Sequence, residues 1–143
     1  MKILAVDLGD ARTGLAACDA TELLASPVGV IHEKDPGTLL KKVAGEALRI
    51  GVGEIVVGHP KNMDNTLGER AEKSAQFARK LEEATGLPVV LWDERGTTVT
   101  AHGYLNVTNT RGKKRKAVVD AVAATIILEN YLAYRKQRGA AER

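Results

Sequence analysis

The chain is poor in cysteine and in aromatic residues, and it lacks any apolar run of the about 18 residues needed to cross a bilayer. Cys18 is the single cysteine among 143 residues, so neither an intramolecular disulfide nor a cysteine-based zinc site can form. Aromatic side chains make up 3% of the chain, which leaves few candidates for base-stacking platforms. No charged-then-apolar leader opens the sequence. These absences predict a soluble, cytoplasmic protein without membrane association.

The positive charge of the chain is concentrated in one place. The segment "RGKKRK", residues 111–116, holds five basic residues and no acid, and the remainder carries 16 basic against 18 acidic side chains. A basic cluster on a nearly neutral body predicts a polyanionic partner, most often nucleic acid. The alternative interpretation is a solvated loop with no partner. With 44% hydrophobic residues, the chain is expected to form one domain, residues 1–143, around an ordinary core.

Apolar periodicity predicts three strands, then strands alternating with helices, and two helices at the end. The strands are expected at Ile3–Asp7, Thr13–Cys18, Ala25–His32, Glu54–Pro60 and within Leu87–Arg95; the helices are expected between Asp35 and Gly51, between Thr66 and Gly86, at Thr97–Leu105 and from about Lys116 to Arg135. The first three strands can pair as antiparallel neighbours, whereas strands separated by helices join in parallel through right-handed crossovers. The fold class is therefore α/β, with a mixed five-stranded sheet and helices on both faces.

Two of these strands end on acids. Asp7 ends the first strand, and Asp93 and Glu94 end the fifth. Ligands of open α/β sheets gather at the carboxyl ends of parallel strands, so these carboxylates are expected to meet at one edge if both strands are central. Gly9 and Gly14 are expected to let the backbone turn tightly there and to let a bulky substrate approach.

Asp120 lies on the last predicted helix, which makes this the third predicted element to contribute an acid to the candidate site. Asp120 precedes Ala124, Ile127 and Tyr131 by four, seven and eleven residues and so shares their apolar stripe. The alternative is an acid in the first turns of a helix, favoured there by the helix dipole. Three carboxylates without a histidine or cysteine cluster indicate Mg²⁺ or Mn²⁺ rather than zinc. Such a site can hydrolyse a phosphodiester with metal-activated water while the basic run holds the backbone.

Four segments carry a family resemblance, and they span the chain from Lys2 to Tyr134. They are "AVDLGDARTGLA", "VVGHPKNMDNTLG", "DERGTT" and "KKRKAVVDAVAATIILENYL". In this order they resemble the YqgF family, also called RuvX, which comprises bacterial RNase H-like proteins related to the RuvC Holliday junction resolvases. The resemblance implies an RNase H-like fold and metal-dependent phosphodiester hydrolysis. It maps the three acids, as catalytic and metal-binding residues, to Asp7, Glu94 and Asp120.

The resemblance also implies roles for residues around the acids. Residues in the signature loops are expected to contact substrate or orient the carboxylates, namely Arg12, Lys61, Asn62 and Arg95. The basic residues before the last helix are expected to hold the phosphate backbone, namely Lys113, Lys114, Arg115 and Lys116. The implied activity is nuclease cleavage in 16S rRNA 5′-end maturation, with Holliday junction resolution as the alternative. Because RuvC-like proteins work as dimers, a homodimer is also expected.

Two rival functions follow from the same residues. The "DLG" segment also resembles the first phosphate loop of sugar kinases and actin-like ATPases, but those need a second similar domain, which 143 residues cannot hold. There is also no G-x-x-x-x-G-K-[ST] loop. A non-catalytic nucleic-acid-binding factor in transcription or ribosome assembly would explain the basic run but not three acids at the ends of elements. Retained binding without cleavage in the presence of metal would favour that factor.

Overall fold

The computed structural model describes residues 1–9, 11–59, 69–93 and 112–141; for 59, 69–71, 93, 112–121 and 137–141 it describes the backbone alone. Five strands and three helices are found in these ranges. The strands are β1 (Ile3–Asp7), β2 (Arg12–Cys18), β3 (Ala25–His32), β4 (Glu54–His59) and β5 (Val89–Asp93), and the helices are α1 (Pro36–Ile50), α2 (Glu69–Thr85) and α4 (Gly112–Ala141). No helix of this described part of the chain is both long and apolar enough to cross a membrane.

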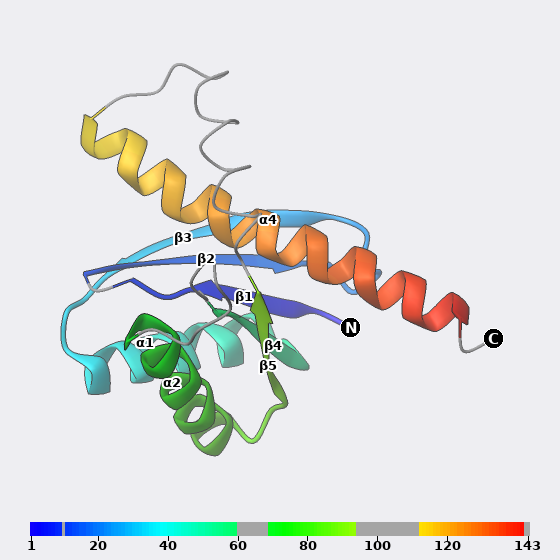
Figure 1. Ribbon diagram of the computed structural model, residues 1–143, viewed down its shortest axis with the longest axis horizontal. Coiled ribbons are helices and arrows are strands. Elements are labelled where there is room, and N and C mark those ends of the chain that lie inside the picture. The colour runs from blue at the N-terminus through cyan, green and yellow to red at the C-terminus, as the bar shows by residue number, and fades with distance from the viewer. Residues whose placement is uncertain (10, 60–68, 94–111, 142–143) are drawn as a thin grey trace.

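The strands form one mixed sheet in the order β3-β2-β1-β4-β5. β1 pairs with β2, and β2 with β3, as antiparallel neighbours, while β4 runs parallel to both β1 and β5. The predicted sheet is therefore confirmed, with β1 at its centre. Figure 1 shows β1 running from the N-terminus toward the end of the sheet where α4 begins.

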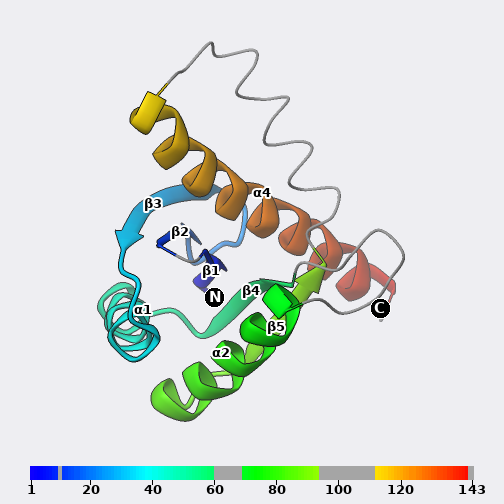
Figure 2. The same ribbon diagram turned by 60° about the vertical axis from the view of Figure 1, so that its left-hand side comes forward.

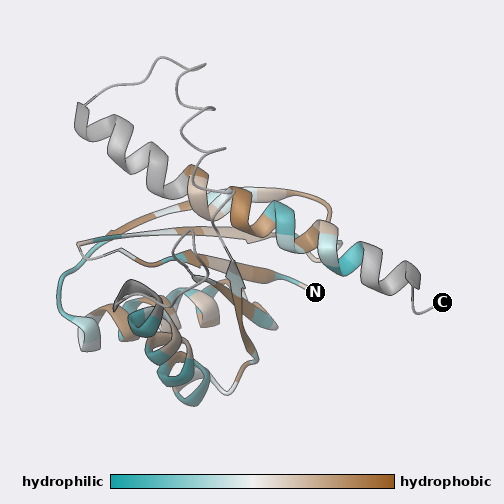
Figure 3. Cartoon of the chain, in the orientation of Figure 1, coloured by the Kyte–Doolittle hydropathy of each residue, from teal (hydrophilic) through white to brown (hydrophobic). Residues whose placement is uncertain are grey.

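Helices cover both faces of the sheet, as predicted. Figure 2 shows α4 on one side and α1 and α2 on the other. On the α4 side, the core contains Ile3, Ala5, Val56, Ala124 and Ile127; on the α1/α2 side, it contains Leu4, Val6, Val57, Val43 and Leu81. Figure 3 shows the corresponding hydropathy pattern, with apolar residues on the sheet and polar residues on the outer side of α2. The alternation along each strand thus decides which side chains meet α4.

Local signals fix the ends of α1 where the sequence predicted them. The Asp35 carboxylate accepts a hydrogen bond from the Thr38 amide at 2.9 Å, and Pro36 occupies the first helical position. At the other end, Gly51 adopts a left-handed conformation with φ of 80° and donates its amide to the Ala47 carbonyl. Gly86 follows α2 in a similar conformation, with φ of 71°.

The structure corrects three predicted boundaries. α4 begins at Gly112 and not at about Lys116, and it ends at Ala141 and not at Arg135. The basic run belongs to the helix because lysine and arginine are strong helix formers, and the helix continues past Arg135 because most of the residues there are helix formers too. β2 also begins one residue earlier than predicted, at Arg12. The predicted cap at Thr66 and the predicted helix Thr97–Leu105 lie outside the described residues.

Candidate active site

Asp7 lies at the carboxyl end of the central strand, on the side that faces α4. Along β1, Ile3 and Ala5 belong to the core beneath α4, whereas Leu4 and Val6 belong to the core beneath α1 and α2. Because successive side chains of a strand point to opposite faces, Asp7 lies on the same face as Ile3 and Ala5. Asp7 is half-buried. The structure therefore directs this carboxylate toward the helix that carries Asp120.

Two glycines shape the surroundings of Asp7, and one acts differently from the prediction. Gly14 is not in the turn: it lies within β2, directly opposite Asp7. Since directly paired residues share a face, no side chain stands beside Asp7 on β2. Gly9 does allow the tight turn, because a Cβ atom there would lie 2.1 Å from the Arg12 carbonyl oxygen. The Gly9 amide donates to the hydroxyl of the buried Thr13 at 3.5 Å.

Arg12 is brought close to Asp7 by the same register. It is the first residue of β2 and precedes Gly14 by two positions, so it shares the face of Asp7 and is its diagonal cross-strand neighbour. Such neighbours have Cα atoms roughly 7–8 Å apart, within reach of a long side chain. The expected role of Arg12, to contact substrate or to orient the carboxylates, stays a prediction, and the strand register brings it near Asp7.

α4 crosses the sheet so that its first half lies toward the Asp7 end. Its second half is fixed at the opposite end, where the Tyr131 hydroxyl donates to the carboxylate of Glu54, the first residue of β4. Glu54 lies level with Ile3 of β1. Position 120 precedes Tyr131 by about 16 Å of helix, at roughly 1.5 Å per residue. β1 advances about 13 Å from Ile3 to Asp7, at roughly 3.3 Å per residue. The backbone at position 120 thus lies near the carboxyl edge that carries Asp7.

A network of charged and aromatic groups fixes that second half of α4. The Arg135 guanidinium donates to Glu54 at 3.1 Å and to Glu22 at 2.8 Å. Hydrogen bonding to Arg135 lowers the pKa of Glu22, and the same contact raises the pKa of Arg135. Burial, followed by the bond to Glu54, raises the pKa of Tyr131 to about 12. The Trp92 ring packs edge-on against Tyr131, with ring centroids 5.5 Å apart.

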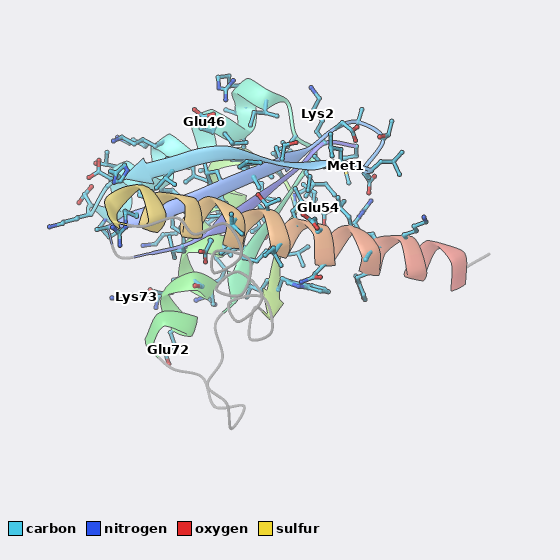
Figure 4. All side chains as sticks on the ribbon, turned by 90° about the horizontal axis from the view of Figure 1, so that it is seen from above. Met1, Lys2, Glu46, Glu54, Glu72 and Lys73 are labelled. Carbon is cyan, nitrogen blue, oxygen red and sulfur yellow. The ribbon has the colours of Figure 1, made fainter. Side chains whose placement is uncertain are left out.

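These contacts bear out the expected packing role of Tyr131. Trp92 and Tyr131 pack against each other and so join β5 to α4. In Figure 4, Glu54 lies beside the second half of α4 with Met1 beyond it, and Lys73 lies toward the end of the sheet where α4 begins. The network is therefore remote from the Asp7 edge, and it acts on that edge only through the position of α4.

The other predicted site residues are described in part or not at all. Position 120 and the basic residues of 113–116 lie within the helical backbone of α4, and nothing further is described of their side chains. The remaining predicted residues lie outside the described ranges, namely Lys61, Asn62, Glu94 and Arg95. Among the side chains that are described, no group of three or more His, Cys, Asp or Glu residues could hold a metal ion.

The donor chemistry at the Asp7 edge fits a hard divalent cation. The side-chain donor there is a half-buried carboxylate with an open position beside it at Gly14. Cys18, the single thiol, is buried within the sheet near Ile3, at the opposite end of β1. Burial raises the pKa of that thiol. Oxygen ligands of this kind suit Mg²⁺ or Mn²⁺ and not a soft metal.

Sequence reasoning missed a cavity on the other face of the same edge. It has a volume of about 520 Å³, and it lies where Leu8 and Gly9 meet α1 and α2. Its basic side chains are Lys34, Lys73 and Lys80. No motif could have found it, because Lys34 is separated from the other two by a helix and a strand. The spacing of Lys73 and Lys80 on one helical face was the one available signal.

Known proteins resemble this chain over almost its full length. A family model described as "RuvX: Holliday junction resolvase" matches residues 1–134. A protein of Halothermothrix orenii named "Putative pre-16S rRNA nuclease" is 43% identical over 137 residues, covering 96% of this chain and 98% of that protein. One of the same name from Geobacillus kaustophilus is 44% identical over 136 residues, covering 92% and 97%.

Solved structures of resolvases share the fold. The RuvC of T. thermophilus in complex with a Holliday junction substrate superposes with a TM-score of 0.63 at 14% identity, over 96% of both chains. The fowlpox virus Holliday junction resolvase gives a TM-score of 0.57 at 14% identity, over 94% of this chain and 99% of that one. The mixed sheet with α4 across one face is therefore the RNase H-like arrangement of these proteins.

Proposed function

Because the chain belongs to the RuvX family, we propose that it is a metal-dependent nuclease that hydrolyses phosphodiester bonds, with pre-16S rRNA as its substrate. One observation carries the proposal: Asp7 faces α4 at the carboxyl end of the central strand, with Gly14 opposite it. Apolar residues occupy the rest of that face of β1, so Asp7 is the one carboxylate on it. The two relatives named above support the substrate.

Three carboxylates would hold the metal in this proposal, from Asp7, Glu94 and Asp120. Asp120 belongs to α4, one helical turn before Ala124, which is buried on the same face as Asp7. Glu94 lies outside the described residues and enters the proposal from the family resemblance. A bound Mg²⁺ or Mn²⁺ would supply activation of a water molecule and stabilisation of the leaving oxygen.

The protein's own groups would bind and orient the scissile strand. The open position at Gly14 leaves room for a phosphate next to Asp7, and the Arg12 guanidinium on the same face would bind that phosphate. The basic residues of 113–116 lie in the first turns of α4, the end of the helix directed to this edge. They would hold the flanking backbone by charge, so affinity should fall steeply with salt. The loop residues Lys61, Asn62 and Arg95 would complete the substrate contacts.

Cleavage assays with a matched substitution test the proposal. End-labelled single-stranded RNA, single-stranded DNA and a four-way DNA junction are incubated with Mg²⁺, Mn²⁺ or EDTA. We expect metal-dependent cutting of RNA by the wild type, and a loss of at least about 100-fold in Asp7→Asn. Asp19→Asn is the control, because it makes the same change at an exposed turn beyond β2. Binding without cutting by the wild type would instead identify a non-catalytic nucleic-acid-binding factor.

Holliday junction resolution is the second candidate function, favoured by the description of the family and by the shared fold. A junction has two symmetric strands to cut, so this candidate also requires a homodimer. Preferential cutting of the four-way junction, together with a dimer in sedimentation analysis, would support it over RNA maturation. A monomer that cuts RNA alone would refute it.

A further inference from the structure

The cavity opposite Asp7 combines an apolar floor with a basic rim. Leu39 and Phe77 are buried in its floor, at 4% and 7% exposure, and Leu8 joins them from the end of β1. Three exposed lysines form its rim, Lys34, Lys73 and Lys80. We call this site the lysine cavity. Its volume of about 520 Å³ is within the roughly 300–1,000 Å³ typical of ligand pockets.

The described charged side chains that line the lysine cavity are all basic. The two nearest acids in sequence to Lys34 are already engaged: Glu33 pairs with Lys42 at 2.9 Å, and Asp35 caps α1. The positive end of the α1 dipole also opens into the cavity through Gly37. A ligand for this site should therefore carry negative charge.

Ser74 is a buried polar residue in the lining of the cavity. It belongs to α2 and is 2% exposed, and within the described part of the chain its hydroxyl makes no hydrogen bond. Leaving a buried polar group unsatisfied is unfavourable, so such a group marks a place where a ligand or a water is expected. The required ligand thus has an apolar body, a hydrogen-bonding group and an anionic group.

We propose that the lysine cavity binds one unpaired nucleotide of the substrate strand, with its base on the apolar floor and its phosphate at Lys34 and Lys80. The inference rests on the proposed function, because it places the site beside the scissile bond. Leu8 and Gly9 line the cavity and directly follow Asp7, so a strand crossing the edge of the sheet would pass from one face to the other around this turn. The base would pack on Phe77, and its polar edge would meet the Ser74 hydroxyl.

Binding measured without divalent metal separates this inference from nuclease activity. A labelled eight-nucleotide single-stranded RNA is titrated in EDTA, so that it stays intact whether or not the chain is a nuclease. We expect Lys34→Ala/Lys80→Ala to weaken binding about tenfold at low salt. The slope of log affinity against log salt should fall by about 0.7 for each lysine. Lys41→Ala/Lys136→Ala removes the same charge outside the cavity and should change affinity less than twofold.

Ser74→Ala tests the cavity interior without altering charge. It should weaken binding of the eight-nucleotide RNA about fivefold, as expected for one lost hydrogen bond. The slope of log affinity against log salt should stay unchanged. Adenosine monophosphate should compete with the octamer and shift the amide NMR signals of Phe77 and Lys80, whereas inorganic phosphate and adenosine should each bind at least tenfold more weakly.

Equal octamer binding by the Lys34→Ala/Lys80→Ala variant and its control would overturn the inference. If adenosine monophosphate bound at these residues without displacing the octamer, the ligand would be a free nucleotide, and the assignment to the substrate strand would be wrong. Neither result depends on cleavage, so the inference can fail while the proposed nuclease activity stands.

Discussion

Removing one oxygen atom from α4 tests how the helix is held over the sheet. Tyr131→Phe keeps the ring beside Trp92 but removes the hydroxyl that donates to Glu54. Glu54 is only 7% exposed, so water cannot fully replace the lost donor. A hydrogen bond to a charged group contributes about 1.5–3 kcal/mol, and we expect the free energy of unfolding to fall by that amount. For a chain of this size, the melting temperature should fall by roughly 5–10 °C.

Urea unfolding, followed by circular dichroism, measures this loss at pH 7.5. Tyr134→Phe is the matched control: Tyr134 lies on the same helix but is 43% exposed, so its loss should be smaller. Repeating Tyr131→Phe in a Glu54→Gln background completes a double-mutant cycle, with an expected coupling of about 1–2 kcal/mol. Additive effects of the two substitutions, or equal losses in both tyrosine variants, would refute the assigned role of the bond.

Comparing the wild type with Tyr131→Phe also gives a prediction of how stability changes with pH. The pKa of Tyr131 is raised from its ordinary value of 10.0 to about 12 in the folded protein. A raised pKa means that folding favours the protonated phenol. The stability that the Tyr131 hydroxyl contributes is therefore complete below pH 10 and is lost between pH 10 and 12. The stability difference between the wild type and Tyr131→Phe should therefore shrink across that window. A difference that grows above pH 10 would contradict the assignment.

Three further outcomes follow from the turn, the first helix and the acid range. Gly9→Ala places a Cβ atom 2.1 Å from the Arg12 carbonyl oxygen, so thermal melting should show a loss of at least about 2 kcal/mol and metal-dependent cleavage should fall. Gly45 is an exposed residue in the middle of α1, and a Cβ atom added there would have nothing within 4 Å. In the same thermal melt, Gly45→Ala should therefore raise the free energy of unfolding by about 0.5–1 kcal/mol. Arg135 lowers the pKa of Glu22 below its ordinary value of 4.5, so the ion pair between them stabilises the fold above pH 4.5 and this stabilisation is lost as the pH falls. The urea midpoints of the wild type and Arg135→Met should therefore converge in acid. A difference between the midpoints that stays constant with pH would count against the ion pair.

The sequence predicted the sheet because its signals were local. Alternating and continuous apolar runs gave the positions of all five strands, and the connections between them required the observed mixture of antiparallel and parallel pairs. The caps of α1 depend on Asp35, Pro36 and Gly51, whose conformational preferences act within a few residues. The boundary of α4 was wrong for a related reason: charge was read as a loop signal, although the helical preference of lysine and arginine prevails there.

The candidate site could be predicted from the sequence only in part, and the packing of the strands and helices supplied the rest. The position of Asp7 at a strand end could be read from the chain, but its orientation toward α4 follows from the packing of Ile3 and Ala5 beneath that helix. The turn predicted at Gly14 is wrong, because the strand register places Gly14 within β2 opposite Asp7; the room it is expected to leave for a substrate stays a prediction. The catalytic, metal-binding and substrate-binding roles assigned to the site residues all remain predictions, those of Asp7, Arg12 and Asp120 included.

By itself the sequence determined the fold class, the order of elements and an acid at the end of the central strand, because each depends on spacing along the chain. The tertiary structure alone decided which distant residues meet. Arg135 reaches Glu22 and Glu54 across more than half of the chain, and Lys34 joins Lys80 around one cavity. Such contacts leave no periodic trace in the sequence, because the two residues come together only when a helix packs across strands formed elsewhere.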